Sequence, residues 1–272
     1  MKKRIRQILT AVFLLISVGS LGVVLYTKQQ YRVSEELYSR ASVQYTSRTE
    51  EGTAETAEAP GEDPDTASPP IQVDFDALLA ENEDIVGWIY CEDTPIDYLV
   101  VQGTDNDYYL RRSYDGVHSM AGTIFVDANN QPGFADCNTI IYGHNMKNGS
   151  MFAVLSRWAE QEFYEEHPVI WFLTPRRNYQ IVLLGGCTTS AYSDVYTIYP
   201  QSCEEFDCYV QDIMAASDFR SEAETEEGAH YAVLSTCSYV FDNARYILLG
   251  KLVPADSAEE NRSGEDGRQI QG

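Results

Sequence analysis

Positively charged side chains are scarce in this sequence. Its 272 residues include 19 Lys and Arg against 42 Asp and Glu, which gives a formal net charge of −23. The central part is acidic too, because residues 71–254 hold 9 basic and 28 acidic side chains, a balance of −19. A protein that binds nucleic acid needs a surface patch of Lys and Arg side chains for the phosphates. The charge therefore excludes nucleic acid as a partner and indicates a well solvated surface.

The sequence also lacks the common motifs of metal and cofactor chemistry. It contains no Cys-x-x-Cys pair, no Gly-rich phosphate loop and no internal repeat, which excludes a zinc knuckle, a thioredoxin-type dithiol and a phosphate-binding loop. We expect neither a metal nor a cofactor. The six cysteines are Cys91, Cys137, Cys187, Cys203, Cys208 and Cys237. Apart from Cys237 we interpret them as buried apolar residues, and their disulfide pairing stays open.

The first 30 residues predict a membrane anchor. Four basic side chains lie within Met1–Arg6, and no charged residue occurs from Gln7 to Thr27. At 1.5 Å per residue this stretch is about 30 Å long, the thickness of a bilayer core. The basic end is expected inside the cell, with the rest of the chain outside. The alternative is a cleaved signal, for which Ser17-Val18-Gly19 would supply the site.

Composition divides the remaining chain into three parts. Residues 31–70 are expected to form an extracytoplasmic spacer that is largely disordered, with a polar helix in its first half and few large apolar side chains from Thr49 to Pro70. Residues 71–254 are expected to form the folded domain. Residues 255–272 are a polar tail.

The domain is predicted to be mainly β with helical additions. Asp74 caps a short helix within residues 73–82, and two helical insertions are expected at Gly149 to Glu166 and at Cys203 to Phe219. Eight short β-rich runs favour a sandwich or a closed barrel. These runs lie at residues 86–90, 98–101, 122–126, 139–142, 169–173, 179–184, 231–237 and 246–253.

The last two of these runs carry a reactive pair. A short loop joins them, so they should be antiparallel neighbours, with Cys237 closing the first and Arg245 opening the second at one rim of a sheet. A fixed cation favours the thiolate, and a guanidinium can hold a carbonyl oxygen as it gains charge. The alternative is that Cys237 is a small buried residue and Arg245 a surface charge.

A thiolate nucleophile works with a histidine that protonates the leaving amine. Of the four histidines, His144 follows an apolar strand in a Gly-flanked turn, where its side chain can reach a sheet rim. We interpret His118, His167 and His230 as structural or solvated residues, because none of them is placed to reach that rim.

Together these motifs resemble a sortase of class B. The resemblance covers residues 73–253 in order. One departure is Val233, where the family motif has Thr, and we expect it to affect packing and not chemistry. It rests on Ile141-Tyr142-Gly143-His144-Asn145-Met146, on Leu234-Ser235-Thr236-Cys237 with Arg245, on Ile85-Val86-Gly87-Trp88-Ile89, on Gln102, on Asp105–Leu110 and on Gly122–Asp127.

The resemblance implies an eight-stranded sortase barrel with an N-terminal helix and a helix before the nucleophile strand. It implies a transpeptidase of a Gram-positive cell surface that cleaves a C-terminal sorting motif after Thr and joins the surface protein to a cell-wall peptide amine. Cys237 would form the acyl-thioester, His144 would transfer the protons, and Arg245 would hold the oxyanion. The substrate groove would be lined by Asn106, Leu110, Tyr142, Tyr196 and Ser235.

Three alternatives remain. A pilus-assembling sortase would use the same chemistry with a pilin Lys as acceptor. A papain-like protease is disfavoured because such enzymes place Cys before His along the chain, whereas His144 comes before Cys237 here. A catalytically silent surface-binding module is disfavoured by the intact His, Cys and Arg positions.

Overall fold

A computed structural model describes residues 2–49 and 68–255. Its centre is a closed barrel with the strand order β10-β8-β7-β3-β4-β5-β6-β9. The barrel strands are β3 (Ile85–Tyr90), β4 (Asp97–Val101), β5 (Ile124–Val126), β6 (Asn138–Tyr142), β7 (Val169–Leu173), β8 (Asn178–Ser190), β9 (His230–Cys237) and β10 (Ala244–Ala255). All eight predicted runs are therefore strands of one closed barrel, which confirms the predicted fold class.

Helices and a small ribbon surround the barrel. The α-helices are α1 (Lys2–Tyr45), α2 (Phe75–Glu81), α3 (Gln161–Glu166) and α4 (Glu204–Ala215), and the 3-10 turns are η3 (Tyr109–Arg111), η4 (Phe152–Ala159) and η5 (Asp194–Tyr196). The ribbon pairs β1 (Thr46–Arg48) with β2 (Ile71–Val73). Asp74 caps α2 as expected, because its carboxylate accepts a hydrogen bond from the amide of Ala77. The two predicted helical insertions correspond to η4 with α3 and to α4.

Several strands have continuous apolar sequences because both of their faces are buried. One face points into the barrel interior, and the other is covered by helices on the outside. Leu234 and Leu248 belong to the interior cluster. Val233 and Ile247, one residue away along the same strands, are buried on the outer face against α4. The burial of Val233 agrees with a packing role for the residue that departs from the family motif. A separate outer cluster lies under the C-terminal part of α1 and under α2.

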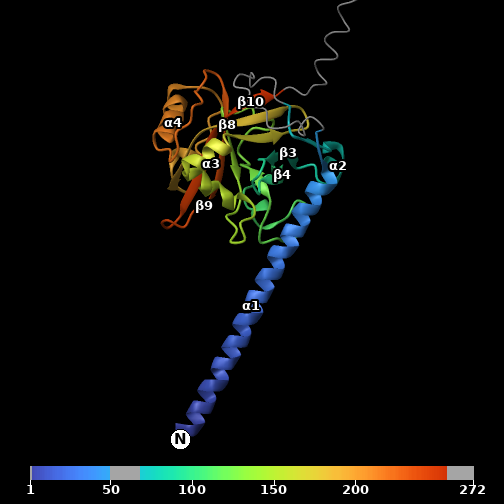
Figure 1. Ribbon diagram of the computed structural model, residues 1–272, viewed down its shortest axis with the longest axis vertical. Helices are drawn as coiled ribbons and strands as arrows, with labels where there is room; N and C mark the ends of the chain where they lie inside the picture. The colour runs from blue at the N-terminus through green and yellow to red at the C-terminus, as the bar shows by residue number, and fades with distance from the viewer. Residues whose placement is uncertain (1, 50–67, 256–272) are drawn as a thin grey trace, which may run out of the picture.

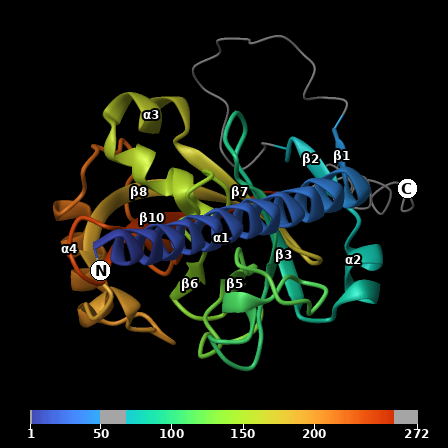
Figure 2. The same ribbon diagram turned by 90° about the horizontal axis from the view of Figure 1, so that it is seen from below.

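Helix α1 is one uninterrupted helix that runs from the N-terminus onto the barrel (Figure 1). Its first part is exposed and is long and apolar enough to cross a membrane. Its last part is buried on one face through Ser34, Tyr38, Ala41 and Tyr45, and their spacing of four, three and four residues follows one side of a helix. Seen from the N-terminal side, α1 crosses in front of the barrel, and its far end lies beside α2 and the β1–β2 ribbon (Figure 2).

This packing corrects the predicted spacer. Residues 31–48 belong to the folded unit, because aromatic side chains on one face of α1 find apolar and polar partners on the barrel. The Tyr38 hydroxyl donates a hydrogen bond to the Gly122 carbonyl and lies 3.1 Å from the hydroxyl oxygen of Thr123. At the other boundary, Ala255 is buried and ends β10, so the predicted tail begins one residue later. Its remaining residues lie outside the described part of the chain.

The residues on either side of the remaining spacer segment lie close together. Residues 50–67 lie outside the described part, but the residues on either side of them are paired with each other. The Thr49 amide donates to the Pro70 carbonyl at 3.1 Å, and the Thr49 hydroxyl donates to the Pro69 carbonyl at 2.8 Å. These bonds extend the pairing of β1 with β2, and the described part of α1 reaches the barrel through its own side chains.

We predict that cutting the chain within residues 50–67 leaves the two fragments associated, because α1 stays packed on the barrel. A specific protease site placed there in the full chain, followed by cleavage in detergent and size-exclusion chromatography, should give one complex. The same cut combined with Tyr38→Ala should release the N-terminal fragment, since truncating a buried aromatic side chain costs about 3–5 kcal/mol. Release after cutting without the Tyr38 substitution would contradict the prediction.

Candidate active site

The strand pair β9–β10 brings Cys237 and Arg245 together. Its register places Cys237 directly opposite Arg245. Opposite residues of an antiparallel pair point to the same face with Cβ atoms about 5 Å apart. That face is the outer one, because Val233 and Ile247, at alternating positions of the same two strands, are buried there beneath α4. The thiol and the guanidinium are therefore neighbours on the outside of the barrel. Neither residue belongs to the apolar cluster that packs against α4.

The Arg245 charge has no carboxylate partner within the described residues. One guanidinium N–H donates to the carbonyl of Ala244 at 3.0 Å. The ion pairs of the described residues are Arg32–Glu36, Arg48–Glu92 and Lys251–Glu226. A cation without an anionic partner at a strand end can favour a thiolate or hold an oxyanion.

His144 reaches the same rim because β6 lies parallel to β9. Tyr142 pairs with Ser235, and the Gly143 amide continues the ladder by donating to the Ser235 carbonyl at 3.0 Å. Only glycine fits at 143, since a Cβ atom there would lie 2.5 Å from the Ile124 side chain and 2.6 Å from the Phe152 ring. The chain can thus leave the sheet tightly and present His144 immediately after it.

A backbone carbonyl orients the His144 ring. Its Nε2 lies 2.8 Å from the carbonyl oxygen of Leu110. A carbonyl only accepts hydrogen bonds, so Nε2 carries a proton and donates it, and Nδ1 is the nitrogen left to exchange a proton. The backbone of Gly122 packs closely against this Leu110 carbonyl. A Cβ atom at 122 would lie 2.7 Å from the Leu110 oxygen, and φ there is +58°, so the position requires glycine.

Asn145 connects the histidine turn to the end of β9. Its side-chain amide donates to the carbonyl of Cys237 at 2.7 Å. The Thr236 hydroxyl adds a second link by donating to the Gly143 carbonyl at 2.8 Å. Sequence reasoning assigned no role to either residue. The signal available was their position, since each lies next to a predicted catalytic residue.

Three of the five predicted groove residues, Tyr142, Tyr196 and Ser235, form one connected surface, which we call the tyrosine wall, next to Cys237. The Tyr196 hydroxyl lies 2.8 Å from the Ser235 hydroxyl oxygen, and the Tyr142 and Tyr196 rings stack with centroids 6.1 Å apart. The Tyr142 hydroxyl donates to Asp127 at 2.8 Å. Burial and the Asp127 charge raise the pKa of Tyr142, so this phenol stays a donor. Asp127 is a residue that sequence reasoning did not assign.

The other two predicted groove residues take part differently. Leu110 joins the site through its carbonyl on His144. Asn106 uses its side-chain oxygen to accept a hydrogen bond from the amide of Ala128 at 2.8 Å, and Ala128 directly follows Asp127, the residue that binds the Tyr142 hydroxyl. The structure therefore brings together Tyr142, Tyr196 and Ser235, with Leu110 beside His144 and Asn106 one step removed.

The other five cysteines differ from Cys237. Cys91, Cys137 and Cys187 are buried as predicted. Burial raises the pKa of the Cys91 thiol to about 12 and that of Cys187 to about 11, which keeps these thiols neutral and poorly nucleophilic. The prediction of burial is wrong for Cys203, which is partly exposed, and for Cys208, which is exposed. Both lie at the start of α4, whose buried face is made by other residues.

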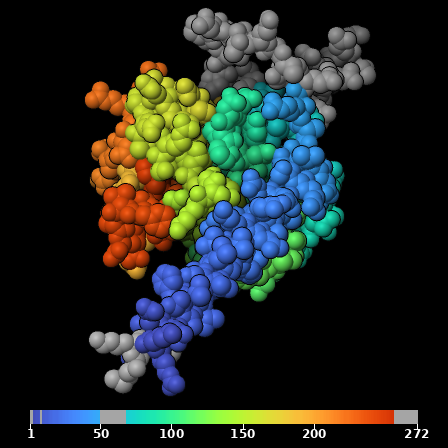
Figure 3. All heavy atoms as spheres, turned by 60° about the horizontal axis from the view of Figure 1, so that its bottom comes forward, coloured from blue at the N-terminus to red at the C-terminus, as the bar shows by residue number. Residues whose placement is uncertain are grey.

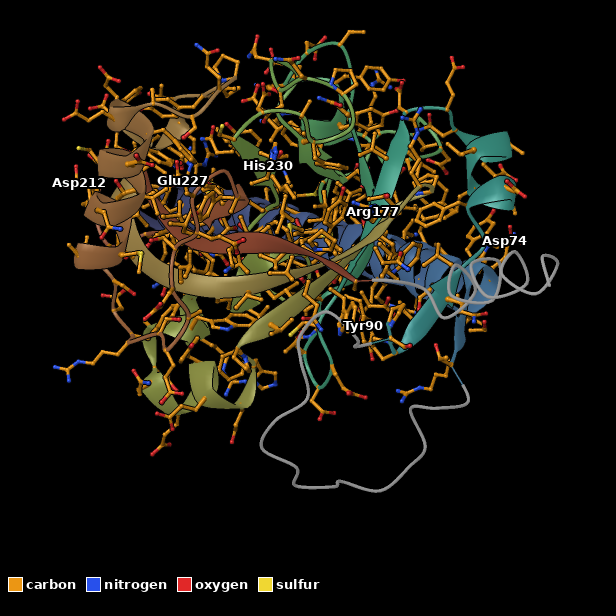
Figure 4. All side chains as sticks on the ribbon, turned by 90° about the horizontal axis from the view of Figure 1, so that it is seen from above. Asp74, Tyr90, Arg177, Asp212, Glu227 and His230 are labelled. Carbon is orange, nitrogen blue, oxygen red and sulfur yellow. The ribbon has the colours of Figure 1, made fainter. Side chains whose placement is uncertain are left out.

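The remaining histidines lie away from the rim. His118 is exposed, and the His167 ring stacks on Phe163 with centroids 4.4 Å apart. His230 begins β9 and therefore lies at the opposite end from Cys237, within hydrogen-bond distance of the Asp136 carbonyl (Figure 4). Within the described residues there is no group of three or more His, Cys, Asp or Glu side chains placed to hold a metal ion.

No family model matches the chain. Among curated proteins it is similar to sortase B of Listeria monocytogenes, with 37% identity over 175 residues that cover 63% of this chain and 71% of the relative. A sortase B of Bacillus anthracis solved in complex with AAEK1 matches with a TM-score of 0.68 and 30% identity over 83% of this chain and 99% of that one. The Staphylococcus aureus sortase B–substrate complex matches with a TM-score of 0.64 and 28% identity over 67% of this chain and 85% of that one.

The match to the Listeria protein exceeds 30% identity and spans more than two thirds of that relative. The structural matches agree with it, since the solved sortase B structures share the closed barrel with its added helices. The chain belongs to the sortase family of cysteine transpeptidases and, within that family, to class B.

Proposed function

We propose that this chain is a membrane-anchored sortase that cleaves a C-terminal sorting motif after Thr and joins the surface protein to the peptide amine of a cell-wall precursor. The observation that supports it is the convergence of Cys237, His144 and Arg245 on one rim of the barrel. The N-terminal part of α1 would be the anchor, with its basic end inside and residues 71–254 outside the membrane.

The proposed reaction starts with attack of the Cys237 thiolate on the carbonyl carbon of the Thr in the motif. The carbonyl oxygen becomes an oxyanion, which the Arg245 guanidinium binds. His144 in its protonated form donates the Nδ1 proton to the leaving amine, the C–N bond breaks, and an acyl-thioester remains on Cys237. The second half reverses these roles. The incoming amine gives a proton to His144, attacks the thioester carbonyl and releases the thiolate.

The tyrosine wall supports a peptide groove leading to the nucleophile. Tyr142, Tyr196 and Ser235 lie on the outer face beside Cys237 and are held by hydrogen bonds and stacking. The matched Staphylococcus aureus sortase B was solved as a substrate complex. We infer that a sorting-motif peptide binds here along β6 and β9, with its Thr carbonyl between Cys237 and Arg245.

Mixing the full chain with a sorting-motif peptide and a peptide amine tests the function. We predict a new amide product, and Cys237→Ala should abolish both this product and the acyl-enzyme, because no other described thiol lies opposite Arg245. Cys208→Ala is the matched control, since it removes an exposed thiol on α4 and should leave turnover unchanged. Mass spectrometry locates the acyl group. An acyl group on a cysteine other than Cys237 would disprove the assignment, and a silent binding module would give no product.

Arg245 is predicted to act through directed hydrogen bonds and not merely through its charge. A guanidinium offers donors in a rigid fork, whereas a Lys ammonium is a point charge on a flexible stem. Loss of one oxyanion donor costs about 10²–10³ in kcat, roughly 3–4 kcal/mol, and we expect both Arg245→Ala and Arg245→Lys to show such a loss in kcat/KM at equal folded fraction. If Arg245→Lys keeps activity within about threefold, a difference of about 0.65 kcal/mol, charge alone is sufficient.

Asn145 is predicted to be a positioning residue that keeps the His144 turn against the end of β9. Asn145→Ala removes the hydrogen bond to the Cys237 carbonyl, and the loss of about 1 kcal/mol should lower kcat about fivefold with little change in KM. Asn148→Ala in the same turn is the control, because the Asn148 side chain bonds only to Ser150. An equal effect of the two substitutions, or a change confined to KM, would refute the positioning role.

A further inference from the structure

The barrel lies close to the end of the uncharged part of α1. That part ends at Thr27, and the first α1 side chain buried against the barrel is Ser34, with no break in the helix between them. Seven residues at 1.5 Å each give a separation of about 10 Å. If Gln7–Thr27 fills the bilayer core, the near end of the barrel is within reach of the headgroup layer.

The end of the barrel on the side of the N-terminal part of α1 is the end that carries Cys237. In Figure 1 the segment that follows β9 lies at the lower left of the barrel, on the side toward the N-terminal end of α1. Figure 4 views the opposite end, where Arg177 in the β7–β8 turn and His230 at the start of β9 are labelled. The strand register agrees, because Ala244 pairs with Ser190 at one end of β10 and Ala255 pairs with Asn178 at the other.

An exposed apolar patch lies at this end, in the loop between β9 and β10 and in the neighbouring turn after β8. Tyr239 and Val240 are each 76% exposed, Phe241 is 49% exposed, and Tyr192 is 82% exposed. We name these four residues the rim patch. Apart from α1, the other large apolar side chains that are exposed within the described residues are Tyr108, Val117 and Met120. In Figure 3, where this end is turned toward the viewer, the red atoms of the β9–β10 region lie on the left, and the blue atoms of α1 run diagonally from the right of the molecule to the bottom of the view.

The backbone holds the rim patch outward. The Ser238 amide donates to the Ala244 carbonyl at 2.9 Å, and the Ala244 amide donates to the Phe241 carbonyl at 3.1 Å. The Ala191 amide donates to the Asn243 carbonyl at 2.8 Å and so links the two turns. The apolar side chains are therefore carried by two hydrogen-bonded turns that are linked to each other.

The chemistry of the rim patch fits a lipid interface. Tyr side chains combine an apolar ring with a polar hydroxyl and gather where membranes meet water. A chain with a net charge of −23 gains no attraction from anionic headgroups, so the contact would depend on apolar burial and not on charge. Two more exposed apolar side chains, Val33 and Val117, lie where α1 meets the barrel. Val33 is next to Ser34 in the sequence and Val117 is close to Ser119, and the hydroxyl groups of these two serines are in contact.

We propose that the rim patch inserts into the interfacial layer of the same membrane that α1 spans. The barrel then has two attachments, the anchor helix and the β9–β10 loop, and the rim that carries Cys237 is held facing the bilayer surface. This inference rests on the membrane anchoring proposed above. It assigns the patch to lipid and not to the sorting peptide, because the groove wall is formed by other residues, Tyr142 on β6, Ser235 on β9 and Tyr196 in η5.

Photo-cross-linking in the full chain tests the proposal. The chain is reconstituted into phosphatidylcholine vesicles with p-benzoylphenylalanine in place of Val240, of Arg177 at the opposite end of the barrel, or of Leu14 within α1. We expect lipid adducts from positions 240 and 14, with at least about tenfold more adduct at 240 than at 177, because interfacial residues contact lipid and the far end does not. Mass spectrometry of the irradiated protein measures them.

The outcomes separate this inference from the anchoring on which it rests. Adducts at position 14 with no more at 240 than at 177 would overturn the docking and leave the anchor standing, and no adduct at 14 would overturn both. The combined variant Tyr239→Ser, Val240→Ser and Phe241→Ser tests the alternative that the rim patch binds the sorting peptide and not lipid. With soluble peptide and amine its KM should stay within about twofold of the parent. An increase of about fivefold or more would assign the patch to the peptide and refute the proposal.

Discussion

Strand β9 is hydrogen-bonded along both edges, and this double pairing is the constraint on which the site depends. One edge is parallel to β6 and the other antiparallel to β10. Because side chains alternate between faces, a slip of one residue in either register would turn the Cys237 thiol into the barrel interior and away from Arg245. The polar side chains near the end of β9 oppose such a slip, since it would break the hydrogen bond between the Ser235 and Tyr196 hydroxyls and the bond from the Thr236 hydroxyl to the Gly143 carbonyl.

The three proposed catalytic residues are therefore positioned by packing far from the chemistry. Val233 and Ile247 fix the strands beneath α4, and Gly143 lets the chain turn where the Ile124 and Phe152 side chains leave no room for a Cβ atom. The hydrogen bonds of Asn145 and Leu110 then set the histidine turn and its ring. Helix α1 contributes to the same region, because Tyr38 is bonded to Gly122, which packs against the Leu110 carbonyl.

The sequence was sufficient to predict the eight strands and the shared rim of Cys237 and Arg245, because alternation, apolar runs and short loops are local signals. It was not sufficient for contacts between distant segments. The burial of Tyr38 depends on Gly122 and Thr123, which are far away in the chain, and without that partner residues 31–48 look like a solvated helix. Pairing of Thr49 with Pro70 across a Pro- and Glu-rich stretch has no local signal either. The roles of Asp127 and Asn145 require knowing which atoms lie opposite them.

The continuity of α1 gives the number of residues between Thr27 and Ser34 a geometric meaning. Each residue of an α-helix advances the chain by about 1.5 Å and turns it by about 100°. One residue inserted in this part of the helix would rotate the whole barrel by about that angle around the helix axis and aim the Cys237 rim in a different direction. Seven inserted residues would complete about two turns, restoring the direction while raising the barrel by about 10 Å. The helical phase of this short segment thus sets the orientation of the domain, while the length of the connection between β1 and β2 does not enter.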